Sequence, residues 1–183
     1  MKYLMLFVDG FEDTEAIATL DVLQRGGDKV VCASVTDSKH IVTKCNINIS
    51  VDCFAKDCNY LDFDALIIPG GPGSFKIMPN LPIVEKLIKE FADNKKLVAS
   101  ICAAPHLVGK LGYLKNHNFT VYPGFEEQII GGFYQKNYGV VTDGKFITAK
   151  SMFYSIDFGL AIHEYFHGKE SAMKLKLACQ GEK

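Results

Sequence analysis

One cysteine, Cys102, stands where a thiol can act as a nucleophile. An apolar run at 97–101 ends at this cysteine, and helix-type spacing of apolar residues follows Pro105. A sharp strand-to-helix turn needs small residues two positions on either side of the nucleophile, and Ser100 and Ala104 meet that need. A helix N-terminus at this joint would lower the pKa of the thiol. The alternative is a buried cysteine that acts as a small apolar side chain.

A carboxyl group after another predicted strand is positioned to assist this thiol. Residues 9–15 read Asp-Gly-Phe-Glu-Asp-Thr-Glu and follow the first apolar run. Helix capping explains the acidic residues at 12 and 13, with Asp13 or Thr14 as the cap. Glu15 lies further in, where a desolvated carboxyl would be protonated and donate a hydrogen bond to a thiolate, or act as a general acid or base.

A glycine-rich segment, Pro-Gly-Gly-Pro-Gly-Ser at 69–74, follows a third predicted strand. Glycines allow a turn that aims backbone N–H groups into a cleft, so Gly70 and Gly71 are candidates for an oxyanion hole. A plain strand-to-helix turn explains the same residues. A P-loop is excluded because the downstream Gly-Lys-Ser/Thr is absent.

Two histidine patterns have less support. His163 and His167 match the HExxH zinc motif, but only 16 residues follow it to supply a third ligand. We interpret this segment as a solvated helix end and expect no metal and no cofactor. His106 lies one helical turn after Cys102, where packing or solvent contact is favoured over a cysteine–histidine dyad. Tyr122 follows a short predicted strand and is a poor base near neutral pH.

The elements that position these residues alternate along the chain. Strands are predicted at 3–8, 29–34, 65–68 and 97–101, and helices at 14–24, 82–91 and 155–166, the last ending near Gly168. Near-continuous apolar strands favour a parallel sheet buried under helices on both faces. Residues 40–51 are predicted as a peripheral hairpin added to this sheet, and 140–148 as two strands joined at Asp-Gly. Ligands of such sheets bind at the carboxyl ends of the strands, where Cys102 lies.

Composition narrows the class of protein. A chain of 183 residues, 48% of them hydrophobic, predicts one domain over 1–183. A net charge of −1 and a single arginine, Arg25, argue against nucleic-acid binding. No apolar run approaches the roughly 20 residues that span a bilayer, and the first is too short for a signal peptide. The six cysteines form no CxxC pair. We therefore expect a cytoplasmic protein without a membrane partner.

Five segments, in order, resemble the ThiJ/PfpI superfamily, and within it the branch of the Parkinson-disease protein deglycase and its bacterial relative YajL. They are Glu12-Asp13-Thr14-Glu15-Ala16, Leu23-Gln24-Arg25-Gly26-Gly27, Ile68-Pro69-Gly70-Gly71, Ala99-Ser100-Ile101-Cys102-Ala103-Ala104-Pro105 and Ile156-Asp157-Phe158-Gly159-Leu160. The resemblance implies an α/β fold of the flavodoxin type, with a doubly wound, mostly parallel sheet between layers of helices and a peripheral β-hairpin. It also implies a homodimer with Arg25 near the contact.

For the site, the resemblance implies Cys102 as nucleophile or peroxide sensor and Glu15 as its protonated partner. It implies an oxyanion pocket formed by Gly71 and the Cys102 amide, with Gly70, Ala103 and Tyr122 in the same pocket. Members of the family are described as cofactor-independent glyoxalases or deglycases that act on methylglyoxal and its adducts, and as oxidative-stress chaperones. Tyr122 stands where some members have a histidine, which leaves the proton transfers to Glu15.

Two other departures concern the surroundings of the site. Residues 150–154 replace a Gly-Pro-Gly-Thr loop, which predicts a narrower, more apolar substrate space. Residues 45–47 replace a Cys-Ser-Arg segment whose arginine pairs with the counterpart of Arg25. Three hypotheses follow: a glyoxalase or deglycase for small 2-oxoaldehydes, a redox-sensing chaperone in which Cys102 oxidation is the signal, and, ranked last, an amidase or glutaminase.

Overall fold

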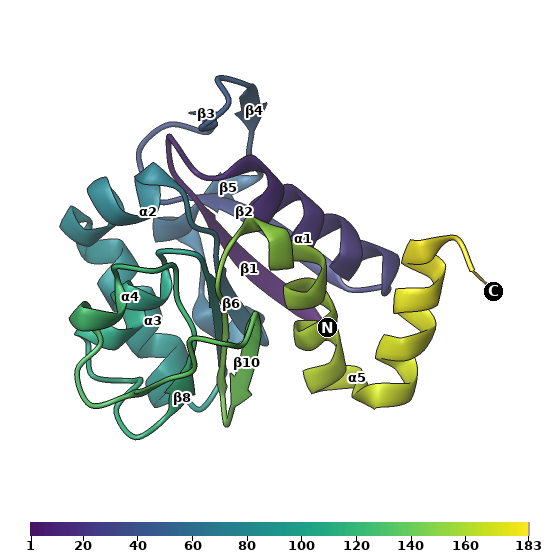
Figure 1. Ribbon diagram of the computed structural model, residues 1–183. Coiled ribbons are helices and arrows are strands. Elements are labelled where there is room, and N and C mark those ends of the chain that lie inside the picture. Colours follow the sequence, from purple (N-terminus) through teal and green to yellow (C-terminus); the bar gives the residue numbers. More distant parts are fainter. Residues whose placement is uncertain (183) are drawn as a thin grey trace.

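The computed structural model describes residues 1–182. Its main sheet has seven strands and lies between two layers of helices (Figure 1). The strand order is β10-β11-β7-β6-β1-β2-β5, and every neighbouring pair is parallel except β10 with β11. The strands are β1 (Lys2–Phe7), β2 (Lys29–Ser34), β5 (Cys53–Phe54), β6 (Ala65–Ile68), β7 (Leu97–Ile101), β10 (Val140–Asp143) and β11 (Phe146–Ala149). The predicted doubly wound, mostly parallel sheet is confirmed.

The helices divide between the two faces of the sheet. On one side lie α1 (Asp13–Arg25) and α5 (Ser155–Gln180), and on the other lie α3 (Pro82–Asp93) and α4 (Pro105–Lys110). The central strand β1 is apolar throughout because both of its faces are covered. Tyr3 and Met5 pack in the α1/α5 layer, whereas Leu4 and Leu6 pack in the α3/α4 layer. Strands covered on both faces have no polar side to expose. The short α2 (Pro72–Lys76) follows β6.

The predicted peripheral hairpin is present, but the main sheet does not extend into it. Strands β3 (His40–Val42) and β4 (Asn48–Ser50) pair antiparallel as a separate two-stranded sheet. The edge beyond β2 is already occupied by β5. The hairpin is attached instead to the loop after β1, where the Val42 amide donates to Asp9 Oδ1 (2.8 Å) and the Gly10 amide donates to the Val42 carbonyl (2.7 Å).

Small elements fill the connections. Strands β8 (Asn118–Phe119) and β9 (Phe133–Tyr134) form a third, parallel sheet. Five 3₁₀ turns complete the described chain: η1 (Ala55–Asp57), η2 (Tyr60–Asp62), η3 (Met78–Asn80), η4 (Glu126–Gln128) and η5 (Met152–Tyr154). Within residues 1–182, no helix has the length and apolar character needed to cross a membrane.

Helix α5 changes direction at Gly168. This residue has φ 82° and ψ 167°, outside the helical range, so the first half ends there as the sequence predicts. A second half continues to Gln180 and folds back toward α1, as the yellow end of the ribbon in Figure 1 shows. The apolar residues Ala172 and Leu175 of this second half are buried, and Leu175 packs with Val22 of α1.

Candidate active site

Cys102 lies on a strained turn directly after β7. Its φ is +63°, in the left-handed region that residues with a Cβ rarely adopt. Such a conformation costs on the order of 1–3 kcal/mol and persists only where its surroundings fix it. Two backbone hydrogen bonds do so: the Cys102 amide donates to the Ala149 carbonyl (2.9 Å), and the Tyr122 amide donates to the Cys102 carbonyl (2.8 Å). The sharp turn indicated by the sequence is present.

Glu15 meets this turn from the first turn of α1. Its side chain is buried and hydrogen bonds with the Cys102 thiol, while Oε2 accepts a hydrogen bond from the Gly70 amide at 3.0 Å. Glu12, not Asp13 or Thr14, caps the helix, since its carboxylate accepts a hydrogen bond from the Glu15 amide at 2.8 Å. Glu12 therefore fixes the first turn of α1, from which Glu15 reaches the sulfur.

Two glycines directly after β6 allow the Cys102 thiol and the Glu15 carboxyl group to approach each other. A Cβ at Gly70 would lie 2.5 Å from Cys102 Cβ and 2.5 Å from Glu15 Oε2. The adjacent Gly71 has φ +90°, and a Cβ there would lie 2.4 Å from the Glu12 amide nitrogen. Any side chain at either position would separate the thiol from the carboxyl group or displace the start of α1, so this close approach requires glycine.

The Glu15 carboxyl group has a pKa suited to proton transfer near neutrality. Burial raises its pKa to about 7; the charge of Glu12 adds to this rise, whereas the hydrogen bonds from Cys102 and Gly70 oppose it. A general base works best when its pKa lies near the working pH. Glu15 is therefore able to accept a proton at neutral pH and to return it.

The Cys102 thiol differs from the acidic thiol that the sequence predicts. Burial, together with the charge of Glu15 and a hydrogen bond to it, raises its pKa to about 12, whereas the amides of Gly71 and Ala103 lower it. The predicted helix dipole is missing at the sulfur, because α4 begins only at Pro105 and has six residues. Between pH about 7 and about 12, the thiol and the carboxyl group together hold one proton. Because the two groups interact, the pKa values of about 7 and about 12 describe the pair and not either residue alone.

The oxyanion pocket differs from the predicted one in the backbone amides that are free to donate. The Cys102 amide is hydrogen bonded to Ala149, and the Gly70 amide is hydrogen bonded to Glu15, so neither faces a substrate. The assignment of the Cys102 amide to the oxyanion pocket is therefore wrong, and Gly70 positions the carboxyl group instead. The amides of Gly71 and Ala103, whose hydrogen bonds to the sulfur lower the pKa of the thiol, are the remaining candidates for oxyanion donors.

Other predicted residues lie around this centre. His106 is buried, its Nδ1 lies 2.6 Å from the Ala103 carbonyl oxygen, and its ring packs on Phe125 with centroids 5.4 Å apart. The predicted packing role is confirmed, and burial lowers the pKa of this imidazole. Tyr122 contributes its backbone, while its side chain is 48% exposed. Arg25 is exposed and pairs with Asp21 at 2.8 Å, so its role in a homodimer stays a prediction.

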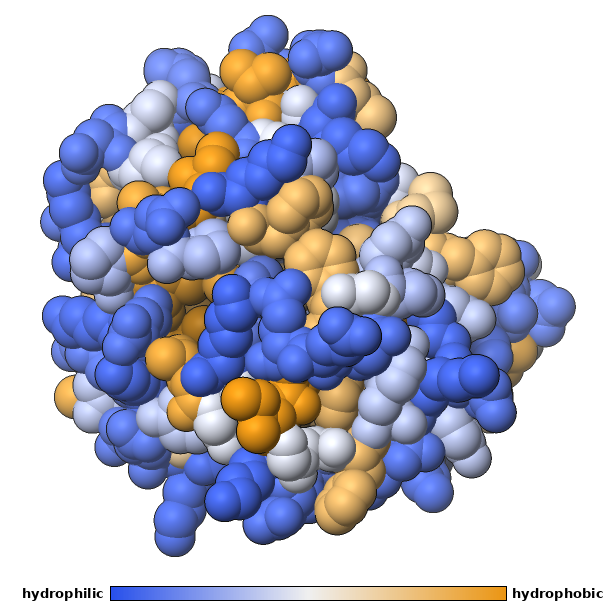
Figure 2. Space-filling view, turned by 60° about the vertical axis from the view of Figure 1, so that its left-hand side comes forward, coloured by the Kyte–Doolittle hydropathy of each residue, from blue (hydrophilic) through white to orange (hydrophobic). Residues whose placement is uncertain are grey.

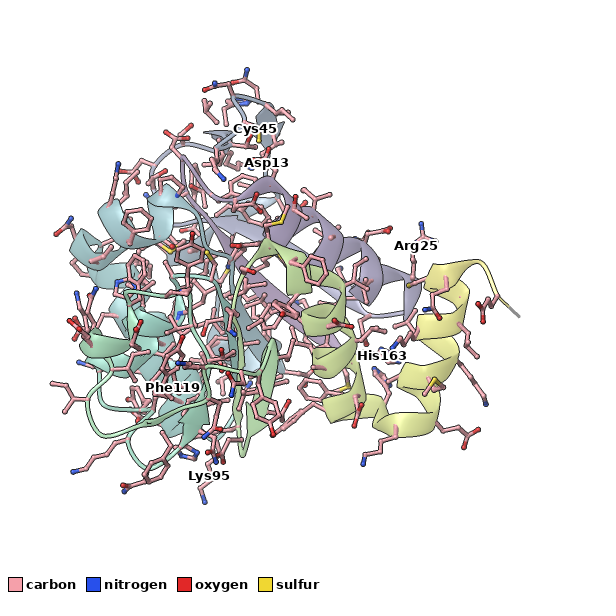
Figure 3. The ribbon with its side chains drawn as sticks, in the orientation of Figure 1. Asp13, Arg25, Cys45, Lys95, Phe119 and His163 are labelled. Atoms are coloured by element: carbon pink, nitrogen blue, oxygen red, sulfur yellow. The ribbon has the colours of Figure 1, made fainter. Side chains whose placement is uncertain are left out.

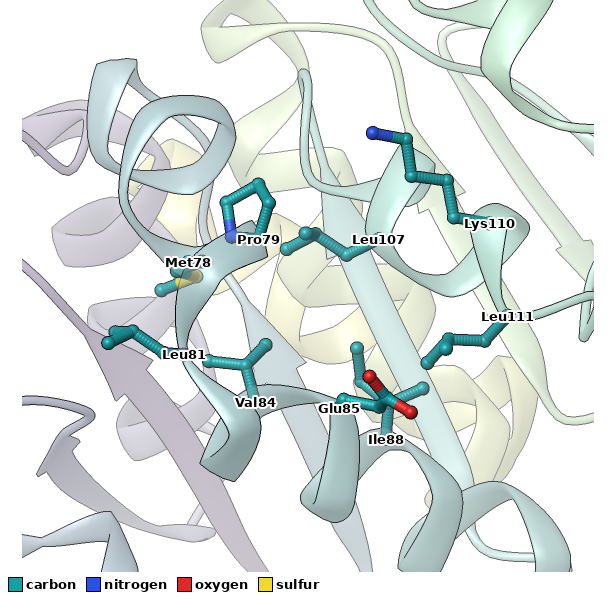
Figure 4. Close-up of a pocket in the computed structure, with 9 residues that line it drawn as sticks. All are labelled: Met78, Pro79, Leu81, Val84, Glu85, Ile88, Leu107, Lys110 and Leu111. Atoms are coloured by element: carbon teal, nitrogen blue, oxygen red, sulfur yellow. The ribbon is translucent and has the colours of Figure 1, made fainter.

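A separate apolar hollow lies on the α3/α4 side of the sheet. It is about 160 Å³ in volume and is lined by residues of η3, α3 and α4, including Met78, Ile88 and Leu107 (Figure 4). Figure 2, with this side turned forward, shows apolar atoms in recesses between hydrophilic side chains. Ligand pockets usually measure about 300 Å³ or more, and Cys102 is not among the lining residues, so we place the site at the thiol.

Comparison with known proteins identifies the family of the chain. Residues 1–165 match the family model described as the DJ-1/PfpI family. The chain belongs to the DJ-1/PfpI family. The protein dj-1beta of Drosophila melanogaster is 30% identical over 173 residues, which cover 94% of this chain and 92% of that protein. A deglycase of Pyrococcus abyssi is 33% identical over 152 residues, which cover 82% of this chain and 90% of that protein.

Solved DJ-1/PfpI structures share the fold along the whole chain. The crystal structure of Drosophila melanogaster DJ-1beta superposes with a TM-score of 0.87 at 28% identity and covers 100% of this chain and 98% of that one. An oxidized DJ-1 of Toxoplasma gondii has a TM-score of 0.90 at 26% identity and covers 99% and 98%. Relatives can be longer: the match to DJ-1 homolog B of Arabidopsis thaliana, 30% identical, covers 97% of this chain but 40% of that protein.

Proposed function

We propose that the chain is a cofactor-independent glyoxalase or deglycase that uses Cys102 on methylglyoxal-type 2-oxoaldehydes or their adducts. The observation that carries the proposal is the hydrogen bond between the partly buried Cys102 thiol and the buried Glu15 carboxyl group. The pKa of Glu15, about 7, suits a proton acceptor. The deglycase name of the Pyrococcus abyssi relative supports the same class of chemistry.

In the first step the sulfur of Cys102 adds to the aldehyde carbon. A carbon–sulfur bond forms, the carbonyl π bond breaks, and the thiol proton passes to the Glu15 carboxylate. A thiol with a pKa of about 12 needs such a base, because little thiolate exists at neutral pH. The amides of Gly71 and Ala103 stabilise the negative oxygen until Glu15 gives it the proton, which completes a hemithioacetal.

In the second step Glu15 moves a proton between carbon atoms. It takes the hydrogen of the former aldehyde carbon, which leaves an enediolate, and returns a proton to the neighbouring carbon. The hydroxyl proton of the former aldehyde carbon passes to the oxygen of that neighbouring carbon. The product is a 2-hydroxyacyl thioester on Cys102. Water then breaks the carbon–sulfur bond, which releases the hydroxy acid and restores the thiol. The sum is methylglyoxal plus water to lactate and a proton, with no external oxidant or reductant.

The direct test is lactate formation from methylglyoxal without glutathione. We expect turnover that rises as the pH increases through about 7 and then levels off, because Glu15 must be ionised to accept the thiol proton. In deuterated water the lactate should carry deuterium at the carbon next to the carboxyl group, since the proton on Glu15 exchanges with solvent. Lactate formation no faster than in a protein-free control would refute the proposal.

A second candidate function is redox sensing by the same thiol. Cys102 is only partly buried, so peroxide can reach it, and Glu15 can hydrogen bond to an oxidised sulfur. The oxidized state named for the Toxoplasma gondii structure favours this possibility. In this alternative, oxidation of Cys102 to a sulfinic acid changes partner binding.

Peptide mass spectrometry after mild peroxide treatment tests the sensor. Cys102 should be converted to sulfinic acid before the other thiols. Cys53 and Cys58 need separate counting, because their sulfur atoms lie 3.4 Å apart and can instead form a disulfide. Equal oxidation of Cys102 and the exposed Cys45 would contradict selective sensing.

A further inference from the structure

A second cluster of chemistry-bearing side chains lies at the opposite end of the sheet from Cys102. Asp28, His163 and His167 each offer a ligand atom, and these atoms all lie within 4.8 Å of one another. Asp28 immediately precedes β2, whereas Cys102 immediately follows β7, and both strands run in the same direction through the sheet. The two groups are therefore separated by the length of the strands, and the cluster takes no part in the chemistry proposed above.

The local structure brings these three side chains together. His163 and His167 are one turn apart on α5, directly before the helix changes direction at Gly168. The loop between α1 and β2 passes close to them, since a Cβ at Gly26 would lie 2.6 Å from His163 Nδ1. Figure 3 shows His163 between the two halves of α5, beside the lower end of α1.

The ligand atoms converge on the Asp28 carboxylate. His163 Nδ1 lies 3.3 Å from Asp28 Oδ2, and His167 Nε2 lies 2.8 Å from Asp28 Oδ1. The two imidazole rings stack with centroids 4.3 Å apart. Ligand atoms around a tetrahedral Zn²⁺ with bonds of about 2.0–2.1 Å lie about 3.3 Å from one another. The distance from His163 Nδ1 to Asp28 Oδ2 already has this value. His167 contacts the other carboxylate oxygen, and the three ligand atoms lie within 4.8 Å of one another, so His167 would shift to bind the same ion.

The surroundings hold the ligands as metal sites do. Tyr3 donates a hydrogen bond from its hydroxyl to Asp28 Oδ2 (3.0 Å), and Ser171 Oγ lies 2.8 Å from His163 Nε2. Metal-binding histidines usually use one ring nitrogen for the metal and the other for a hydrogen bond. The Asp28 and His163 side chains are buried, whereas His167 is 30% exposed and opens a path from solvent. The Met1 amino group also donates to Asp28 Oδ1 at 2.8 Å, a contact that a metal would replace.

This geometry changes the interpretation of the HExxH match. The sequence argument against zinc looked for a third ligand after His167, but the structure supplies Asp28, which precedes His163 by 135 residues. The expected solvated helix end is also wrong for His163, which is 2% exposed. Glu164, the base of the motif in metalloproteases, is exposed and lies outside the cluster, so the arrangement supports binding without proteolysis.

We propose that Asp28, His163 and His167 form a site for one divalent transition-metal ion, with Zn²⁺ as the preferred occupant. Two imidazoles and one carboxylate suit Zn²⁺ better than Mg²⁺ or Ca²⁺, which prefer all-oxygen sites. Three protein ligands leave the fourth position for water on the side of His167. The ion would link the start of β2 to the first half of α5. Hydrogen bonds from Tyr3 to Asp28 and between Ser171 and His163 would connect β1 and the second half of α5 to these ligands.

Metal titration of chelator-treated protein tests the site. We expect one equivalent of Co²⁺ to produce visible d–d absorption without thiolate charge-transfer bands, and Zn²⁺ to displace it and raise the melting temperature. His167→Gln, at the exposed ligand, should weaken Zn²⁺ binding by at least about 100-fold. Ser171→Ala should weaken it by about tenfold, because loss of an outer hydrogen bond typically costs 10–100-fold.

Two variants serve as controls. His117→Ala removes another histidine paired with a carboxylate, Asp143 at 3.1 Å, and Glu164→Gln removes the exposed acid of the motif. Both should bind Zn²⁺ as the wild type does. Zn²⁺ affinity that is unchanged in His167→Gln, or no uptake by the wild type, would overturn the proposal and leave the cluster as a hydrogen-bonded support.

Discussion

A Cys102→Ser variant is expected to lose about a thousandfold or more of the glutathione-independent rate of lactate formation. A serine hydroxyl has a far higher pKa than a thiol, and Glu15, with a pKa of about 7, is too weak a base to activate it. The substitution keeps the size and hydrogen-bonding capacity of the side chain on the strained turn. Loss of activity would therefore report on the nucleophile, with circular dichroism and the melting temperature as checks on folding.

The matched control is Cys45→Ser, which replaces an exposed thiol in the loop between β3 and β4. This variant should retain the wild-type rate. Methylglyoxal consumed equally fast by Cys102→Ser and by the wild type would show that turnover, if present, uses a different group.

A Glu15→Gln variant should lower the same rate by about 10² to 10⁴-fold, the usual contribution of a general base. The amide keeps the shape of the carboxyl group and can still accept the hydrogen bond from Gly70, but it cannot take up the thiol proton. The increase in rate as the pH rises through about 7 should be absent in Glu15→Gln, because the carboxyl group that ionises there has been removed. Iodoacetamide labelling of Cys102 across pH measures the same change without a substrate.

The same substitution should make the protein more stable in mild alkali. Burial raises the pKa of Glu15 from 4.5 to about 7 in the folded state. The folded state therefore tolerates the protonated carboxyl group better than the ionised one. Between pH 4.5 and about 7 the unfolded chain loses this proton while the folded protein keeps it, so stability falls. Above about 7 the folded protein holds a buried charge, and the total loss is up to about 3 kcal/mol for a shift of this size. In urea unfolding at pH 8, the free energy of unfolding should therefore be higher for Glu15→Gln than for the wild type. At pH 4 the two free energies of unfolding should agree.

Glu12→Gln gives the matched comparison for Glu15→Gln. It removes a neighbouring charge that raises the pKa of Glu15, so the inflection should move to lower pH while turnover remains. A Glu15→Gln protein with the wild-type pH profile would show that another group moves the proton.

Much of the fold follows from patterns that the sequence shows directly. Strands β2, β6 and β7 have the predicted bounds, and β1 is shifted by one residue, because continuous apolar runs have few alternatives to a buried parallel sheet. The attachment of the β3–β4 hairpin was not predictable from its own residues. It depends on Asp9 and Gly10, more than thirty positions away from Val42.

The site was predictable in its members but less so in its electrostatics. The turn at Cys102, the approach of Glu15 and the need for glycine at 70 and 71 follow from residue types next to strand ends. The pKa of the thiol depends on how far α4 begins from the sulfur and on which amides remain free, and neither is visible in the sequence. Asp28 lacked any local signal, because its partners come from the far end of the chain.

The contacts of Asp28 also affect local unfolding at the two ends of the chain. One carboxylate contacts Tyr3 on the first strand and both histidines on the last helix, so it closes nearly the whole chain into a loop. Neither segment can detach without breaking a bond to this carboxylate, which the other segment also contacts. Fraying of the N-terminal end of β1 and of the part of α5 that carries His163 and His167 should therefore be coupled, with amide protons at these two places exchanging together.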